Sequence, residues 1–411
     1  MKFKKKLKYK FWDCSFVRSL CELKFQCPTQ IKKCVALAAK QTPWPCAPSS
    51  AILSALQNTT IQGTTAREKV DSRGSSGAQC VNPAVNNSRI LYPNISNQKI
   101  SRMIKNFSPK SLGINGRQSE LIELALTYGF KGMDVDMPEM LRRNLRSETG
   151  DASKYLDAAK KAFDIKIGGF ALDIDLDSDD DTFTSQVGTL HPLADFAKEQ
   201  GAERAYIKLP AATNRLPFQE FFEVQTSRLN QIAEVLASRD IKLGVGFSAG
   251  KELEGDKEFP FIRNVEGFIS LVKGLGHGAG FYVDTWDWIV GEGAMDQLSE
   301  LTADQIVAVR LCSVPEDVDV AKAESWQRIV PTAEGALDHT KLIAHLASIG
   351  FDGPVSPGAT GISYKGQTRE SIVQLGQEAI DGIFTAAGLT VAPLPKDTIE
   401  EDAPYEPISA E

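Results

Sequence analysis

Residues 204–247 read RAYIKLPAATNRLPFQEFFEVQTSRLNQIAEVLASRDIKLGVGF and contain the repeating unit that decides the fold. A short strand-like run, Arg204–Leu209, is followed by Glu220–Ser238, whose apolar side chains recur at helical spacing, and then by a second run, Ile241–Phe247. Short strands that alternate with helices pair in parallel, because a crossover helix returns the chain to the same end of the sheet. The stretch therefore predicts one strand–helix–strand unit.

The same unit recurs along residues 110–388. Strand-like runs, each ended by polar residues or by a Gly or Pro turn and each followed by a helical pattern, are Ser111–Ile114, Gly132–Met137, Ile165–Leu176, Arg204–Leu209, Ile241–Phe247, Gly280–Val283, Ile306–Leu311 and Gly353–Ser356. Eight such units favour a closed (β/α)8 barrel over an open doubly wound sheet. We therefore predict an α/β fold in which residues 103–390 form a single TIM barrel, with its chemistry where the strands end.

Charge divides the chain into parts of different character. Residues 1–102 hold 17 Lys and Arg against 4 Asp and Glu, whereas the remaining residues hold 29 against 49, which together give the net charge of −7. Six of the seven cysteines also lie in this first part, and only Cys312 belongs to the predicted barrel. Residues 391–411 are acidic and rich in proline, which predicts a solvated tail.

The basic first part, residues 1–102, matches no targeting or metal-binding pattern. Its best apolar run, Cys34–Ala39, is shorter than the roughly 7–15 residues of a signal-peptide core, and no stretch approaches the roughly 20 apolar residues of a membrane helix. Its cysteines lack the paired spacing of a zinc site, and Lys2–Lys10 would attract phosphate only without specificity. We expect a poorly ordered extension, a functional chain that begins near Met103, and a cytoplasmic protein that binds neither membrane nor nucleic acid.

Two stretches in the second half resemble a known family. Residues 280–288 read GFYVDTWDW and residues 350–356 read GFDGPVS, within longer similar stretches at 259–314 and 328–356. They are similar to the xylose-isomerase-like barrels, which include sugar phosphate isomerases and epimerases, hydroxypyruvate isomerases and type-2 apurinic endonucleases. The resemblance covers roughly residues 110–388. It implies proton transfer next to the carbonyl of a small sugar or hydroxyacid, with a divalent metal polarising the substrate oxygens and two glutamates moving the proton.

This chain departs from the ligand set that the resemblance implies. Gly246 and Gly358 stand where the family has glutamates, and glycine has no side chain that could bind a metal or carry a proton. Asp284 matches a family ligand. The other implied positions carry Asp287 in place of His, Arg310 or Leu311 in place of His or Gln, and Ser313 in place of Asp.

Histidine counts against a metal site independently of any family. The chain has four histidines. His191, His339 and His345 fall in predicted helices and His277 precedes the sixth strand, so none is expected to face the barrel mouth. We therefore expect no firmly bound metal cofactor, although carboxylates alone could hold Mg²⁺ weakly.

Charged and polar residues nevertheless fall near the predicted strand ends. They are Asn115, Asp136, Asp173, Asp175, Lys208, Asp284, Asp287, Arg310 and Ser313. Lys208 and Arg310 either neutralise two of the aspartates or clamp a phosphate or carboxylate ligand. The acidic run at residues 177–181 is expected to cap the following helix, because it lacks the Gly and the final Glu of a calcium loop.

We interpret the mouth as the site of a divergent isomerase, epimerase or lyase acting on a small sugar, polyol or sugar acid. The candidate catalytic residues are Asp284, Lys208 and Asp136. The candidate substrate-binding residues are Asn115, Trp286, Asp287, Arg310 and Ser313, with Trp286 able to stack on a sugar ring. The alternative is a barrel that binds a small ligand or serves as a scaffold without catalysis, because fold alone does not determine activity. A homo-oligomer is compatible with either interpretation.

Overall fold

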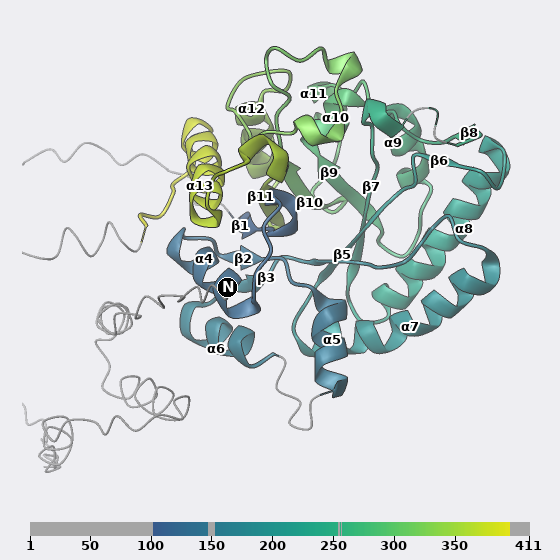
Figure 1. The fold of residues 1–411 in the computed structure, drawn as a ribbon, viewed down its shortest axis with the longest axis horizontal. Coiled ribbons are helices and arrows are strands. Elements are labelled where there is room, and N and C mark those ends of the chain that lie inside the picture. The colour runs from purple at the N-terminus through teal and green to yellow at the C-terminus, as the bar shows by residue number, and fades with distance from the viewer. Residues whose placement is uncertain (1–101, 147–152, 254, 256, 395–411) are drawn as a thin grey trace, which may run out of the picture. The chain divides into compact units, whose positions relative to one another are not determined.

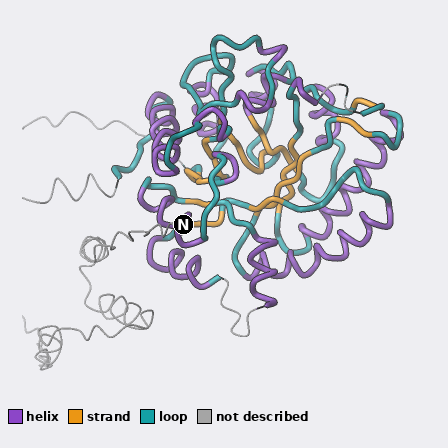
Figure 2. The backbone as a smooth tube through the Cα atoms, in the orientation of Figure 1, coloured by secondary structure: helices purple, strands orange, loops and turns teal. Residues whose placement is uncertain are grey.

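The computed structural model describes residues 102–146, 153–253, 255 and 257–394. In this part of the chain, parallel strands form one curled sheet with helices around its outside (Figure 1 and Figure 2). The predicted TIM barrel is confirmed. The expectations for residues 1–101 and for the tail after residue 394 concern residues outside the described part.

The strands of the barrel are short. In chain order they are β1 (Ile104–Phe107), β2 (Gly132–Met133), β3 (Lys166–Ile167), β4 (Phe170–Ala171), β5 (Arg204–Lys208), β7 (Lys242–Gly246), β9 (Gly280–Asp284), β10 (Ile306–Leu311) and β11 (Pro354–Pro357). A separate antiparallel pair, β6 (Ala212–Thr213) and β8 (Phe259–Pro260), lies in the connections after β5 and β7.

The barrel closes at one interrupted strand position. The hydrogen-bonded order is β3-β2-β1-β11-β10-β9-β7-β5-β4, so its two ends, β3 and β4, are separated along the chain only by Gly168 and Gly169. A Cβ atom on Gly168 would collide with the side chain of Asn106, and one on Gly169 would collide with the ring of Tyr206. Glycine at both positions therefore lets these two side chains fill the barrel where the strand breaks.

The prediction of the first strand is wrong. Ser111–Ile114 does not form a strand, because a 3-10 turn, Lys110–Leu112, begins after Pro109 and ends at Gly113 in the left-handed conformation with φ of 66°. The first strand is β1, which pairs with β2 on one side and β11 on the other. Each of the other predicted runs overlaps a strand, and the run at 165–176 contains both β3 and β4.

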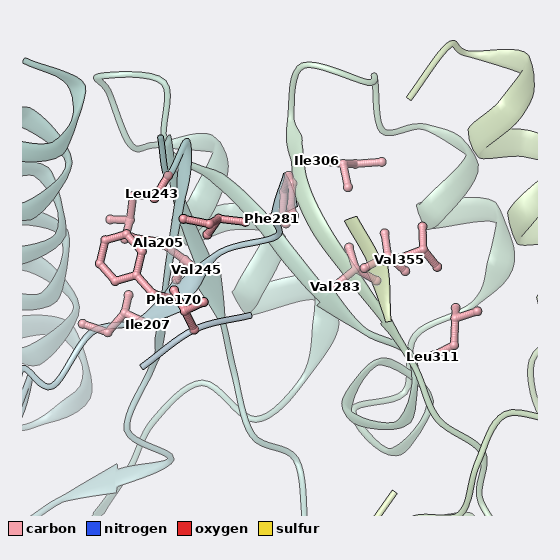
Figure 3. Close-up of a cluster of buried hydrophobic side chains, with 14 of the residues drawn as sticks. Phe170, Ala205, Ile207, Leu243, Val245, Phe281, Val283, Ile306, Leu311 and Val355 are labelled. Carbon is pink, nitrogen blue, oxygen red and sulfur yellow. The ribbon is translucent and has the colours of Figure 1, made fainter. Parts of the chain in front are cut away.

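Alternation along the strands separates the core from the barrel interior. Figure 3 shows Ala205 and Ile207 of β5 with Leu243 and Val245 of β7, all of which belong to the main buried cluster shared with the helices. The residues between them face the other way, because successive side chains of a strand point to opposite faces. Lys208, at the end of β5, thus faces the barrel interior at its mouth.

Helices cover the outside of the sheet. They are α4 (Gln118–Thr127), α5 (Met137–Arg146), α6 (Lys154–Phe163), α7 (Asp180–Glu199), α8 (Phe218–Ala237), α9 (Val265–Lys273), α10 (Thr285–Val290), α11 (Met295–Ser299), α12 (His339–Ser348) and α13 (Arg369–Ala386). The predicted role of the acidic run is confirmed, since Asp179 caps α7 by accepting a 2.8 Å hydrogen bond from the Thr182 amide. None of the helices among the described residues has the length and apolar character needed to cross a membrane.

Candidate active site

A cavity of about 440 Å³ opens at the carboxyl ends of the strands. Its wall comes mainly from the segments that follow β1, β2 and β4, and its floor from β5, β9 and β10. The residues that carry its polar groups are Ser108, Lys110, Ser111, Asn115, Asp134, Asp136, Tyr206, Lys208, Tyr282 and Arg310. Four predicted site residues, Asn115, Asp136, Lys208 and Arg310, are therefore brought together at one mouth.

A buried charge cluster supports the floor of this cavity. Lys208 Nζ lies 2.7 Å from Asp287 Oδ2 and 3.8 Å from Asp284 Oδ2. Arg310 donates two hydrogen bonds to Asp284 Oδ2, one from Nε at 2.7 Å and one from Nη2. A third cation, Arg328, lies 2.6 Å from Asp287 Oδ1 and 3.9 Å from Asp284 Oδ2. Three cations thus surround two carboxylates.

Asp284 is committed to this cluster and to the backbone. It ends β9 and caps α10, where its Oδ1 accepts hydrogen bonds from the amides of Trp286 and Asp287 at 3.1 and 3.3 Å. Burial by itself would raise the pKa of Asp284, but the neighbouring cations, Arg310 foremost, hold that pKa well below its usual range. Asp284 is therefore a carboxylate fixed in its ionised form rather than a group that exchanges protons near neutral pH.

The two basic residues of the cluster that line the cavity differ in the direction of their net pKa shift. Burial lowers the pKa of Lys208, and the nearby Asp287 only partly offsets this. Burial also opposes the charge of Arg310, but the carboxylate of Asp284 raises the Arg310 pKa well above its ordinary value. Both side chains line the cavity and keep one face open to it.

Three predicted substrate-binding residues do not line the cavity. Trp286 is fully buried beneath Arg328, whose guanidinium carbon lies 4.4 Å from the ring centroid, so the indole has no open face for a sugar. Asp287 is fully buried and accepts hydrogen bonds from Lys208 and from the Ala249 amide. Ser313 binds Thr332 in the connection after β10, away from the cavity.

The remaining predicted carboxylates lie at the rim or outside it. Asp136 is partly exposed and pairs with Lys110 at 2.8 Å, which lowers its pKa against the effect of burial. Asp173 and Asp175 are exposed and do not line the cavity. Asp136 therefore belongs to the site as a neutralised ion pair.

The sequence interpretation missed Asp134, a carboxylate in the cavity wall. Its Oδ1 accepts a 2.9 Å hydrogen bond from Asn106 Nδ2. Burial raises the pKa of Asp134 to about 6, although hydrogen bonds from Ser108 and Asn106 and the charge of Arg310 oppose the rise. Because Asp134 and Asp136 both follow β2 at alternate positions and both line the cavity, the sequence marks the strand end but does not show which carboxyl has the raised pKa.

Two tyrosines form the floor beneath these groups. The rings of Tyr206 and Tyr282 stack with centroids 4.6 Å apart, and the Tyr206 hydroxyl donates to the Gly168 carbonyl at 3.1 Å. Burial raises the pKa of Tyr282 to about 12 and that of Tyr206 well above its usual value. Both phenols therefore stay protonated and neutral beside Asp134.

The donor set does not suit a divalent cation. A Cβ atom on Gly358 would lie 2.6 Å from Cys312 Sγ and 2.9 Å from Arg310 Cδ, so the Arg310 side chain already fills the space of a glutamate there. A Cβ atom on Gly246 would lie 3.3 Å from the Tyr282 ring and 3.5 Å from Lys208 Cγ. In the described part of the chain, no group of three or more His, Cys, Asp or Glu residues is arranged to hold a metal ion.

Comparison with known proteins agrees with this fold. The model of the xylose isomerase-like TIM barrel family matches residues 122–380, which is more than half of the chain. The chain belongs to this family. A search of curated proteins gives no match.

Several solved structures resemble this family member. A xylose isomerase domain protein from Alicyclobacillus acidocaldarius subsp. acidocaldarius has a TM-score of 0.60 at 18% identity, over 69% of this chain and 99% of that one. The IOLI protein, solved with a zinc atom, has a TM-score of 0.57 at 14% identity, over 69% and 98%. The probable 3-DHS dehydratase AsbF from Bacillus anthracis has a TM-score of 0.52 at 13% identity, over 68% and 99%. At these identities the likeness concerns the fold.

Proposed function

We propose that this barrel is an isomerase or epimerase that moves a proton at the carbon next to a carbonyl group of a small sugar or sugar acid, without a divalent metal. One observation carries the proposal. Asp134, whose pKa of about 6 lies close to neutral pH, lines the same cavity as Lys208 and Arg310. A group that titrates near the working pH is suited to both accept and return a proton.

Each group has a distinct role in this proposal. Ionised Asp134 takes the proton from carbon and returns it as the acid. Lys208 and Arg310 stabilise the negative charge that develops on the carbonyl oxygen, since cationic donors in a water-poor cavity are effective for this purpose. Asn115 and Asp136, at the rim, bind substrate hydroxyl groups. Asp284 is a positioning residue that holds Arg310.

The alternative is a barrel that binds a small ligand without turning it over. The absence of a carboxylate at Gly246 and Gly358 favours it, because one acid–base group has to serve where the family resemblance implies two glutamates. The alternative keeps the same cavity and the same ligand contacts. Only a measurement of proton exchange separates the two.

The test is exchange of carbon-bound hydrogen with solvent. The full chain is incubated in D₂O with a panel of aldoses, ketoses and sugar acids, and deuterium in each compound is followed by NMR. We expect exchange into at least one compound and a loss of roughly 10²–10⁴-fold in Asp134→Asn, the usual contribution of a general base. The matched control is Asp352→Asn, whose side chain is 76% exposed and precedes β11, and which should exchange at the wild-type rate. Binding without exchange in the wild type would establish the alternative.

A further inference from the structure

The charges at the floor of the cavity do not cancel. Lys208, Arg310 and Arg328 carry three positive charges, whereas Asp284 and Asp287 carry two negative charges. The nearest other acids on the cavity wall are Asp136, which is neutralised by Lys110, and Asp134, which is hydrogen bonded to neutral groups. The cluster therefore keeps one unmatched positive charge whenever Asp134 is protonated.

The surplus charge is open to the cavity. Lys208 is 32% exposed, and its ammonium donates one hydrogen bond, to Asp287, so further N–H groups remain for a ligand. The five N–H groups of Arg310 make three hydrogen bonds with described residues, two to Asp284 and one of 3.3 Å to Ser111 Oγ. Both residues line the cavity, whereas Arg328 does not.

We infer that the ligand of this cavity carries a single carboxylate group, which binds Lys208 and Arg310. This inference rests on the proposed function and narrows its substrate class to small sugar acids whose carboxylate is itself the carbonyl group next to the reacting carbon. Lys208 and Arg310 then bind the same oxygens on which the negative charge develops. A carboxylate matches the planar donor arrangement of a guanidinium and brings one negative charge, equal to the surplus. A phosphate dianion would bring two charges to a cluster that can balance one. A neutral polyol would leave the surplus unmatched.

Protonation of Asp134 controls the same balance. The charged and titratable groups that face Asp134 are Arg310 from β10, Tyr206 from β5 and Tyr282 from β9, and both tyrosines stay neutral. When Asp134 ionises, its charge cancels the surplus and repels an anion. Binding of a carboxylate is therefore linked to proton uptake, and affinity should fall as pH rises through about 6. Proton transfer in the bound state needs the ionised form of Asp134, so its rate should increase with pH while the affinity decreases.

The experiment compares probes that share one carbon skeleton. Binding of D-gluconate, D-sorbitol and D-glucarate to the full chain is measured by calorimetry at pH 5 and pH 7; D-glucarate has two carboxylates and carries two negative charges at both pH values. We expect D-gluconate to bind at least about tenfold more tightly than either other probe at pH 5. A proton-linked site with a pKa of about 6 should also lose up to about tenfold in gluconate affinity between the two pH values. Equal binding of sorbitol, or tighter binding of the dianion D-glucarate, would overturn the inference.

Two variants identify the groups responsible. Asp134→Asn keeps the shape of the side chain and removes its charge, so gluconate affinity should become independent of pH and exceed that of the wild type at pH 7. Lys208→Met should lose the preference for gluconate over sorbitol. The control is Lys198→Met on α7, where Lys198 forms an exposed ion pair with Asp240, and this variant should keep the preference. If Lys208→Met does not fold, the Asp134→Asn variant still tests the inference. Gluconate affinity that continues to depend on pH in this variant would refute the link between ligand binding and protonation of Asp134.

The outcomes separate the two proposals. Gluconate binding with the expected preference, but without deuterium exchange in any compound, would retain the ligand class and reject the isomerase. Exchange into a neutral sugar, with no preference for gluconate, would retain the isomerase and reject the ligand class.

Discussion

Replacing Asp134 with Asn should stabilise the protein above pH 6, although the residue lines the cavity. The folded state raises the pKa of this carboxyl from 3.8 to about 6, so the folded protein holds the proton more tightly than the unfolded chain. The contribution of Asp134 to stability is therefore full below pH 3.8 and is lost as the pH rises through 6. Asn remains neutral throughout and avoids this loss.

The expected magnitude follows from the size of the shift. A change from 3.8 to about 6 corresponds to about 3 kcal/mol, and contact of the carboxylate with the open cavity makes this an upper limit. We expect Asp134→Asn to raise the free energy of unfolding by about 1–3 kcal/mol at pH 8 and to change it little at pH 4. The amide can still accept the hydrogen bond from Asn106 and can donate to Ser108.

The assay is urea unfolding followed by tryptophan fluorescence at several pH values between 4 and 8. Subtracting the wild-type curve removes the titration of every group that the two proteins share. Asp352→Asn, at a carboxyl that is 76% exposed, serves as the control for the loss of an exposed carboxyl group. A difference between wild type and Asp134→Asn that is the same at every pH, or a destabilised variant at pH 8, would refute the reasoning.

Three other perturbations test the charge cluster. Gly358→Glu should lower the free energy of unfolding by about 2–4 kcal/mol, because the new side chain displaces Arg310; an unchanged urea midpoint would contradict this. Asp284→Asn should lower the free energy of unfolding by about 3–5 kcal/mol at pH 7, because it leaves buried cations uncompensated. Since the folded state lowers the pKa of Asp284, the difference in free energy between variant and wild type should shrink only below pH 3.8, the pKa in the unfolded chain. Urea unfolding at pH 7 and pH 2.5 measures this. Addition of MnCl₂, ZnCl₂ or EDTA should leave the melting temperature unchanged, and a tightly bound metal in untagged protein, detected by mass spectrometry, would count against the cluster as we describe it.

The strand pattern could be predicted because it depends on local alternation. Runs such as Ile241–Phe247 carry apolar side chains on one face that pack against helices, and this burial specifies both the strand and its facing. The first strand was misplaced because Ile104–Phe107 and Ser111–Ile114 are equally short and equally apolar. The turn that rules out the second run is local: Pro109 precedes it and Gly113 ends it in the left-handed conformation, so these two residues were the signal against a strand there.

The site could be predicted only in part. Lys208 and Arg310 were placed at the mouth because strand ends of a barrel meet at one face. Trp286 was misjudged since its burial depends on Arg328, which comes from the connection after β10 and reaches back across the mouth. Asp134 was missed because a carboxylate becomes reactive through burial and partners such as Asn106, which lies 28 residues away in the chain.

The contact between Gly358 and Arg310 also limits how this protein could change during evolution. A carboxylate at position 358 has no room while Arg310 stays in place. Loss of Arg310 first would leave Asp284 with only the more distant cations Lys208 and Arg328, at 3.8 and 3.9 Å. Each single step is therefore expected to destabilise the protein. Changes at these two positions are therefore expected to occur together. Reconstructed ancestral sequences should carry either both Arg310 and Gly358 or neither of them.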